Sequence, residues 1–138
     1  MSRAHRVLVT ESRNWEDHAV VWEKLDWEAN RAWQSGLPMV VVHGACPTGA
    51  DHWAEQWVQQ RKLTGWPVSS EPHPANWSAL GSKAGPKRNN HMVSLGADVV
   101  LVFILDESKG ASGCLKAART AKLLVDVTTA TSGALTAL

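Results

Sequence analysis

The segment HGACPTGAD, residues 43–51, carries the residues best suited to binding chemistry. It follows the apolar run MVVV and precedes HWAEQWVQQ, so it predicts a strand that ends in a Gly-rich turn and opens a helix. It is not a P-loop, because no Gly-Lys-Ser/Thr follows, and it lacks the G-x-G-x-x-G pattern. Backbone N–H groups at a helix N-terminus attract anions. We therefore predict phosphate contacts from Gly44, Thr48 and Gly49, or, in the alternative, glycines that only permit the turn.

Asp51 falls in the first turn of the helix that follows this segment. A carboxylate there interacts favourably with the helix dipole. The alternative is a hydrogen bond from a ribose hydroxyl. The sequence leaves both roles open.

Further polar residues follow the other predicted strands. Arg88 is the strongest candidate, because a guanidinium can bind phosphate in a bidentate manner. Arg13 could reach the same anion or form a surface ion pair, and Ser12 could donate to phosphate or cap a turn. A second Gly-rich turn is predicted at 108–113. The remaining candidates for phosphate contact are Asn89, Ser112 and Gly113.

The chain has eight tryptophans and no tyrosine. Helical spacing places Trp22, Trp33, Trp53 and Trp57 in the core. Trp15 and Trp77 lie in predicted loops beside the candidate site, where they could stack on a base or close a loop over the core. Trp27 lies off the apolar stripe and hints at a homo-oligomer interface.

Histidines and cysteines offer rival chemistries. His43, His73 and His91 could meet at a metal with Asp51 or Cys46, but no pair has the close helical spacing of a zinc motif, so we predict no metal. No pattern supplies an activating base for a nucleophilic cysteine. We expect no cofactor and leave the catalytic residues unknown.

Strands alternate with helices along the chain, which predicts an α/β fold with a parallel sheet covered on both faces. Ligands of such sheets bind beyond the carboxyl ends of the strands. We expect a single domain over 1–128 and a loose tail over 129–138. The predicted strands are 6–10, 39–43, 67–72, 97–105 and 123–127, and the principal predicted helices are 17–36, 88–95 and 114–122.

Composition narrows the function classes. The chain has 138 residues, 44% hydrophobic and 20% charged, a mix typical of soluble globular domains. A formal charge of +1 gives no reason to expect a nucleic-acid partner. No apolar run approaches the ~20 residues of a membrane span. With two cysteines and no pattern typical of a signal peptide, we expect a cytoplasmic protein.

The motifs VTESRNW, HGACPTGAD, HPANW, AGPKRNNHMV and GASG together resemble the YspA/YpsA-like branch of the SLOG superfamily. These are Rossmann-like domains of bacteria and their phages, and the resemblance covers residues 6 to about 127. It implies a doubly wound sheet in the order 3-2-1-4-5 and a nucleotide or nucleotide-derived ligand. The superfamily also includes the LOG phosphoribohydrolases and the DprA-like single-strand DNA binders.

Two departures from these relatives matter. Glu11 stands where the branch usually has glycine, and a carboxylate would repel phosphate unless it points away or meets a ribose hydroxyl. Ala117 stands where the LOG enzymes carry a catalytic glutamate, and alanine cannot stabilise an oxocarbenium ion or activate water. We therefore expect a nucleotide binder or sensor. The alternatives are a hydrolase that uses Glu11, Asp51 or Glu107, and a DprA-like DNA binder.

Overall fold

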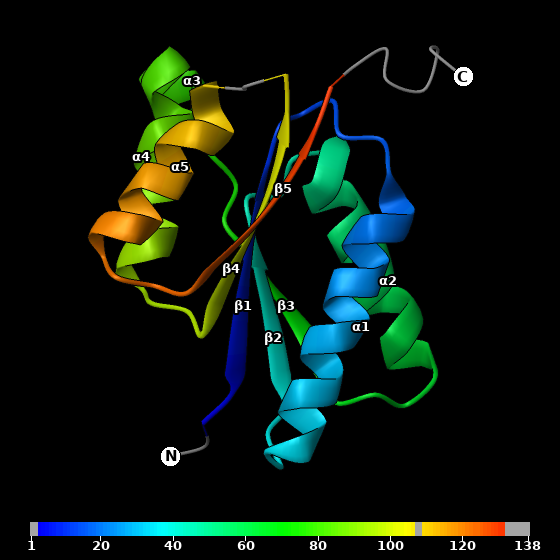
Figure 1. Cartoon of the computed structure of the whole chain (residues 1–138). Coiled ribbons are helices and arrows are strands. Elements are labelled where there is room, and N and C mark those ends of the chain that lie inside the picture. The colour runs from blue at the N-terminus through cyan, green and yellow to red at the C-terminus, as the bar shows by residue number, and fades with distance from the viewer. Residues whose placement is uncertain (1–2, 107–108, 132–138) are drawn as a thin grey trace.

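Five parallel strands form one sheet in the computed structural model, which describes residues 3–106 and 109–131 (Figure 1). The strand order is β3-β2-β1-β4-β5 and every neighbouring pair is parallel. This arrangement confirms the predicted Rossmann-like α/β fold and its 3-2-1-4-5 order. The strands are β1 (His5–Glu11), β2 (Met39–His43), β3 (Val68–Pro72), β4 (Val99–Leu105) and β5 (Val125–Ala130).

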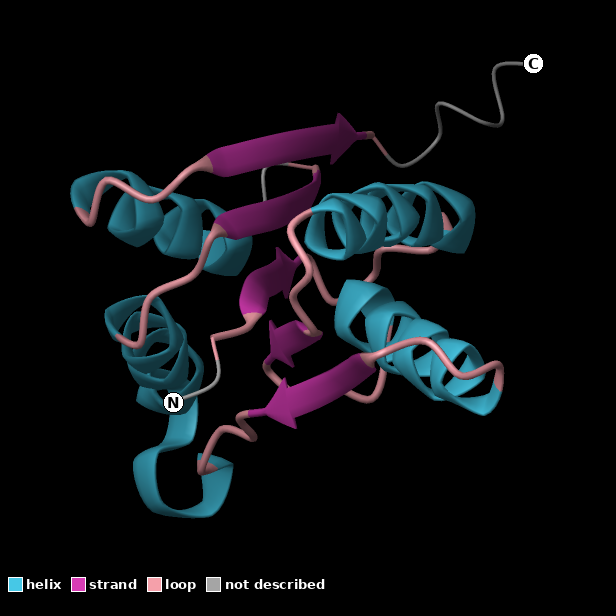
Figure 2. Ribbon diagram, turned by 90° about the horizontal axis from the view of Figure 1, so that it is seen from below, coloured by secondary structure: helices cyan, strands magenta, loops and turns pink. Residues whose placement is uncertain are grey.

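Helices cover both faces of the sheet (Figure 2). One face packs against α1 (His18–Gln34) and α2 (Gly49–Leu63), and the other against α4 (Ala84–Ser94) and α5 (Lys109–Thr120). A short helix α3 (Trp77–Leu80) and a 3-10 turn η1 (Gly81–Lys83) lie between β3 and α4. No helix in the described ranges is both long and apolar enough to cross a membrane.

Each strand sends alternate side chains to opposite faces. On β1, Val7 and Val9 join the core beneath α1 and α2, whereas Leu8 joins the core beneath α4 and α5. Glu11 has the same parity as Val7 and Val9, so β1 directs its carboxylate toward the α1–α2 layer. The alternation thus decides which helix Glu11 meets at the end of the strand.

The buried stripe of α1 differs from the predicted one. Its buried residues are Val21, Leu25, Glu28 and Ala32, and Trp33 is 73% exposed, so the prediction of a core Trp33 is wrong. The buried face of α1 is therefore shifted by one residue from the predicted face: Ala32 takes the buried position that was predicted for Trp33. The other three helical tryptophans pack as predicted: Trp57 is fully buried, and Trp22 and Trp53 pack on the core from partly buried positions.

Three boundaries in the second half of the chain also differ. Helix α4 begins at Ala84 rather than at 88, because Pro86 falls in its first turn, where a missing N–H leaves no helical bond unmade. Helix α5 begins at Lys109, so the predicted Gly-rich turn at 108–113 is wrong from 109 onward; Ser108 lies outside the described residues. Strand β5 runs to Ala130 and takes in the first residues of the predicted tail; residues 132–138 lie outside the described part.

Candidate functional site

A cavity of about 1240 Å³ lies at the carboxyl ends of the strands, and we call it the carboxyl-edge cavity. The loops after β1 and β2 form one side, and α3 and α4 form another. The C-terminal end of β4 and the N-terminal half of α5 complete the lining. The structure brings these predicted site residues to its lining: Ser12, Arg13, Gly44, Thr48, Asp51, Trp77, Arg88, Asn89 and Gly113. Gly49, Trp15 and Ser112 do not line it.

The first turn of α2 already holds an acidic side chain, that of Glu11. Glu11 Oε2 accepts a hydrogen bond from the Ala50 backbone N–H at 2.6 Å. The N-cap residue, Thr48, makes no side-chain cap; its hydroxyl donates instead to the Arg13 carbonyl at 2.9 Å. The first amides of a helix have no partner within the helix, so Glu11 caps α2 from the neighbouring strand by accepting from one of them. The predicted phosphate-facing amides of this turn therefore have an internal partner.

Gly49 makes this cap possible. Its φ is +75°, in the left-handed region that favours glycine. A Cβ atom there would lie 1.8 Å from Glu11 Oε2 and 2.8 Å from the Arg13 carbonyl oxygen. The glycine therefore leaves room for the carboxylate as well as permitting the turn.

Asp51 is 3% exposed and holds the β2–α2 loop from inside. Its Oδ2 accepts from the backbone N–H of Gly44 at 3.0 Å and of Cys46 at 3.3 Å. Its position in the first turn of α2 also suits the helix dipole, as predicted. Asp51 thus holds the β2–α2 loop through Oδ2, and its Oδ1 takes no part in these hydrogen bonds.

Two buried carboxylate oxygens have no hydrogen-bond partner within the described residues: Glu11 Oε1 and Asp51 Oδ1. Burial, followed by the nearby Asp51 charge, raises the pKa of Glu11 to about 8. Burial likewise raises the pKa of Asp51, against the opposing influence of His43 and Arg88. A buried polar atom without a partner costs about 1–3 kcal/mol. The pair therefore carries a cost that added hydrogen-bond donors would relieve.

Arg88 reaches the cavity from α4. Its Nη1 donates to the carbonyl oxygens of Gly44 and His73, and its Nε donates to Asn89 Oδ1 at 2.7 Å. A Cβ atom on Gly44 would lie 2.4 Å from Nη1, so only glycine lets the guanidinium approach this closely. The side chain is half-buried rather than solvated. Gly44 thus has a steric role that the sequence alone did not suggest.

Ser12 is buried and bonded to β4. Its Oγ accepts from the Leu105 N–H at 2.7 Å and lies 3.4 Å from the Leu105 carbonyl oxygen, to which it donates. This contact ties the start of the β1–α1 loop to the end of β4. The hydroxyl thus bonds across to β4 and does not cap its own turn, which was the predicted alternative.

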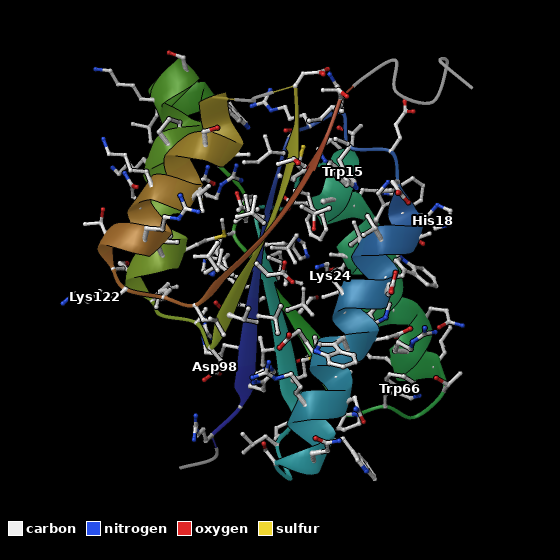
Figure 3. The ribbon with its side chains drawn as sticks, in the orientation of Figure 1. Trp15, His18, Lys24, Trp66, Asp98 and Lys122 are labelled. Carbon is white, nitrogen blue, oxygen red and sulfur yellow. The ribbon has the colours of Figure 1, made fainter. Side chains whose placement is uncertain are left out.

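The two candidate stacking residues separate in the structure. Trp77, at the start of α3, is 45% exposed, and the Arg13 guanidinium lies 4.7 Å from its ring centroid. Trp15, labelled in Figure 3, is 3% exposed. It packs against Phe103, with ring centroids 5.4 Å apart. The expected base contact by Trp15 is corrected: it closes its loop over the core, because the β1–α1 connection folds inward at this residue.

The first turns of α5 contribute only in part. Gly113 lines the cavity, whereas Ser112 is exposed and does not line it. Ala117 lies further along α5, partly buried against the core beneath α4 and α5. The position that matches the LOG glutamate therefore faces the sheet. Glu107, the third carboxylate named for a hydrolase, lies outside the described residues.

Of the three histidines named for a metal, His43 and His73 are engaged with carboxylates, and the ring of His91 packs edge-on against that of His73. His43 Nε2 lies 2.8 Å from Glu55 Oε1, and its Nδ1 accepts from the Ala45 N–H, so Nε2 is the protonated nitrogen. His73 Nε2 lies 2.8 Å from Glu71 Oε2. Within the described residues, no cluster of three or more His, Cys, Asp or Glu side chains could hold a metal. Cys46 and Cys114 are free thiols, and burial raises the pKa of Cys114.

Glu11 is the residue that the sequence analysis undervalued. The sequence predicts for it a contact with a ribose hydroxyl or a role in a hydrolase, but not the cap on α2, although strand parity alone directs it toward that helix. Strand parity does not predict how deeply the Glu11 carboxyl is buried, because that burial depends on the absence of a side chain at Gly49.

Comparison with known proteins gives two matches. Residues 5–79 match the YAcAr family, described as the YspA, cpYpsA-related SLOG family. The "Gene 61 protein" of Mycobacterium phage D29 is 42% identical over 120 residues, which span 87% of this chain and 93% of the phage protein. No solved structure matches. The family match covers the β1 and β2 loops and the start of α3, but not Arg88.

Proposed function

The chain belongs to the YspA, cpYpsA-related SLOG family, and from this premise we propose that it binds a nucleotide or nucleotide-derived small molecule in the carboxyl-edge cavity. Family membership suggests a nucleotide-related function. The cavity, at about 1240 Å³, is large enough for a nucleotide by the usual size of ligand pockets.

One observation carries the proposal: Arg88 and Trp77 line the same cavity. Arg88 supplies the charge for phosphate. Its bonds to Gly44, His73 and Asn89 use Nη1 and Nε and hold the guanidinium plane, so a phosphate would be met by Nη2. Trp77, which is 45% exposed with the Arg13 guanidinium over its ring, supplies an aromatic ring for a base.

Neighbouring residues fit supporting roles. Arg13, exposed at the cavity, adds a second cation. Asn89 supplies an amide whose oxygen is already engaged by Arg88, which leaves its NH₂ group to donate. Gly113 lets a ligand approach the backbone of α5 closely. In this assignment Ser12, Thr48 and Gly49 shape the site from beneath and make no direct contact with phosphate.

Small molecules released from the purified protein by denaturation test the proposal. Mass spectrometry of the extract should detect a nucleotide or nucleotide derivative. Arg88→Ala, purified in parallel, should carry less of the same compound, and the exposed Arg31→Ala on α1 should carry as much as the unaltered protein. A compound without a phosphate or an aromatic base, bound equally by all three proteins, would contradict it.

A further inference from the structure

The two partnerless oxygens of the site belong to side chains that are otherwise fixed. Glu11 is held through Oε2 by the Ala50 N–H, and Asp51 is held through Oδ2 by the N–H groups of Gly44 and Cys46. Glu11 Oε1 and Asp51 Oδ1 are left without partners at defined positions, and both residues line the cavity. Burial raises the pKa of Glu11 to about 8, and Oε2 accepts from Ala50, so Oε1 is the oxygen that carries the proton near neutral pH. Buried polar atoms are almost always hydrogen-bonded, so such a pair calls for a hydrogen-bonding partner.

A phosphate does not fit this place. The amide that would meet it at the first turn of α2 already bonds Glu11, and the two acidic groups would repel further negative charge. A multiply liganded metal is not favoured either, since the described residues offer no cluster of three acidic, histidine or cysteine side chains. Two adjacent hydroxyls fit this place, because each can donate to Asp51 Oδ1 or accept from a protonated Glu11 Oε1.

Gly44 is hydrogen-bonded both to Asp51 of this acidic pair and to Arg88. The Gly44 N–H donates to Asp51, and the Gly44 carbonyl accepts from Arg88. The acidic pair and the guanidinium therefore lie on either side of a single residue. A ligand that spans them must carry its hydroxyl donors and its anionic group within a few bonds of each other, as a ribose 5′-phosphate does.

We propose that Glu11 and Asp51 form a subsite for the vicinal 2′- and 3′-hydroxyls of a ribose. The proposal rests on the proposed function and adds an orientation: the diol meets the acidic pair, the phosphate meets Arg88, and the base lies toward Trp77. The site thereby distinguishes ribonucleotides from deoxyribonucleotides.

Calorimetric titration with AMP, GMP, CMP and UMP, and with their 2′-deoxy counterparts, tests the subsite. A hydrogen bond to a charged group corresponds to roughly 10- to 150-fold in affinity, and we expect the nucleotide that binds to exceed its 2′-deoxy form by a factor in this range. In Glu11→Gln, which keeps an oxygen for Ala50, the ratio should fall several-fold. Glu16→Gln, an exposed carboxylate in the same loop and outside the cavity, should leave it unchanged.

The two proposals fail in different ways. Nucleotide binding with a ribo-to-deoxy ratio near one, equal in Glu11→Gln, overturns the diol subsite and leaves the proposed function intact. Binding of none of the nucleotides counts against the proposed function. The subsite is then tested by saturation-transfer NMR with methyl β-D-ribofuranoside and its 2-deoxy analogue. A preference for the riboside that Glu11→Gln abolishes supports the subsite, and equal signals overturn it.

Discussion

A Cβ atom on Gly49 would lie 1.8 Å from Glu11 Oε2. The Glu11 carboxyl at the end of β1 therefore fills the space that a side chain at Gly49, at the start of α2, would need. This contact explains how the Gly-rich turn accommodates a carboxyl group beside a helix N-terminus. The position of Glu11 in the cavity lining therefore depends on the absence of a side chain at Gly49.

Gly49→Ala should destabilise the protein far more than Gly65→Ala. Both glycines have positive φ, but a Cβ atom at Gly65 would meet nothing within 4 Å. Gly65→Ala should therefore cost about 1–2 kcal/mol from backbone strain alone. Gly49→Ala must also displace Glu11 or shift α2, and we expect at least about 2 kcal/mol more. Urea unfolding of the two variants measures the difference, and equal losses would show that Glu11 moves away freely.

Glu11→Gln should change how stability depends on pH. Burial and Asp51 raise the pKa of Glu11 from 4.5 to about 8, so the folded protein keeps a proton that the unfolded chain releases. The free energy of unfolding should therefore fall as pH rises from the unfolded to the folded pKa, by at least about 1 kcal/mol. The Glu11→Gln profile should be flatter in this window.

Other titrating groups face the pair, namely His43, Cys46 and Cys114, and they are common to both proteins. Unfolding in urea at several pH values between about 4.5 and 9 compares the profiles. Parallel profiles for the two proteins would mean that Glu11 does not hold the extra proton.

Gly44→Ala should weaken ligand binding without removing any charge. Its Cβ atom would lie 2.4 Å from Arg88 Nη1 and 2.6 Å from the guanidinium carbon, so the guanidinium must move. We expect a loss of affinity approaching that of Arg88→Ala, roughly 10-fold or more. Calorimetry on both variants and on Gly65→Ala, which lies outside the cavity and where a Cβ atom meets nothing, compares them. Full affinity in Gly44→Ala would place the phosphate away from Arg88.

Much of this arrangement was predictable, because each strand of the sheet is a short apolar run followed by a distinctive turn. Hydrophobic runs and alternating helices were enough for the parallel sheet, whereas its strand order came from the resemblance to the SLOG superfamily. The turn residues and the matched motifs were enough to bring Arg88, Gly44 and Asp51 to one edge. Trp15 was ambiguous because a tryptophan in a loop packs inward or outward according to its neighbours, and here Phe103 lies beneath it.

Other features depend on how deeply a side chain is buried and on what it meets there, which the spacing of residues along the chain does not encode. The burial of Glu11 follows from the space at Gly49, and the engagement of Ser12 with Leu105 follows from the meeting of β1 and β4. Helix α5 was predicted too short because two glycines in its first turns mimic a loop; early helix positions pack less and tolerate them.

The protein should not release free base from nucleoside 5′-monophosphates at an enzyme-like rate. Ala117 packs against the core, and the Glu11 and Asp51 carboxylates are engaged with the backbone of α2 and its loop. A chromatographic assay of base release checks this expectation. Robust release that Arg88→Ala abolishes would contradict it and favour a hydrolase.

The central claim is that Arg88 binds the phosphate of a nucleotide. Calorimetric titration of the protein, Arg88→Ala and Arg88→Lys with a panel of ribonucleoside 5′-monophosphates and ADP-ribose tests it most directly. Removing a charge-assisted bond of about 1.5–3 kcal/mol should lower the affinity of Arg88→Ala by roughly 10- to 150-fold. Arg88→Lys should recover only part, because lysine lacks the planar fork. Equal affinities in all three proteins, with Arg88→Ala losing only stability through its bonds to Gly44 and His73, would contradict the account.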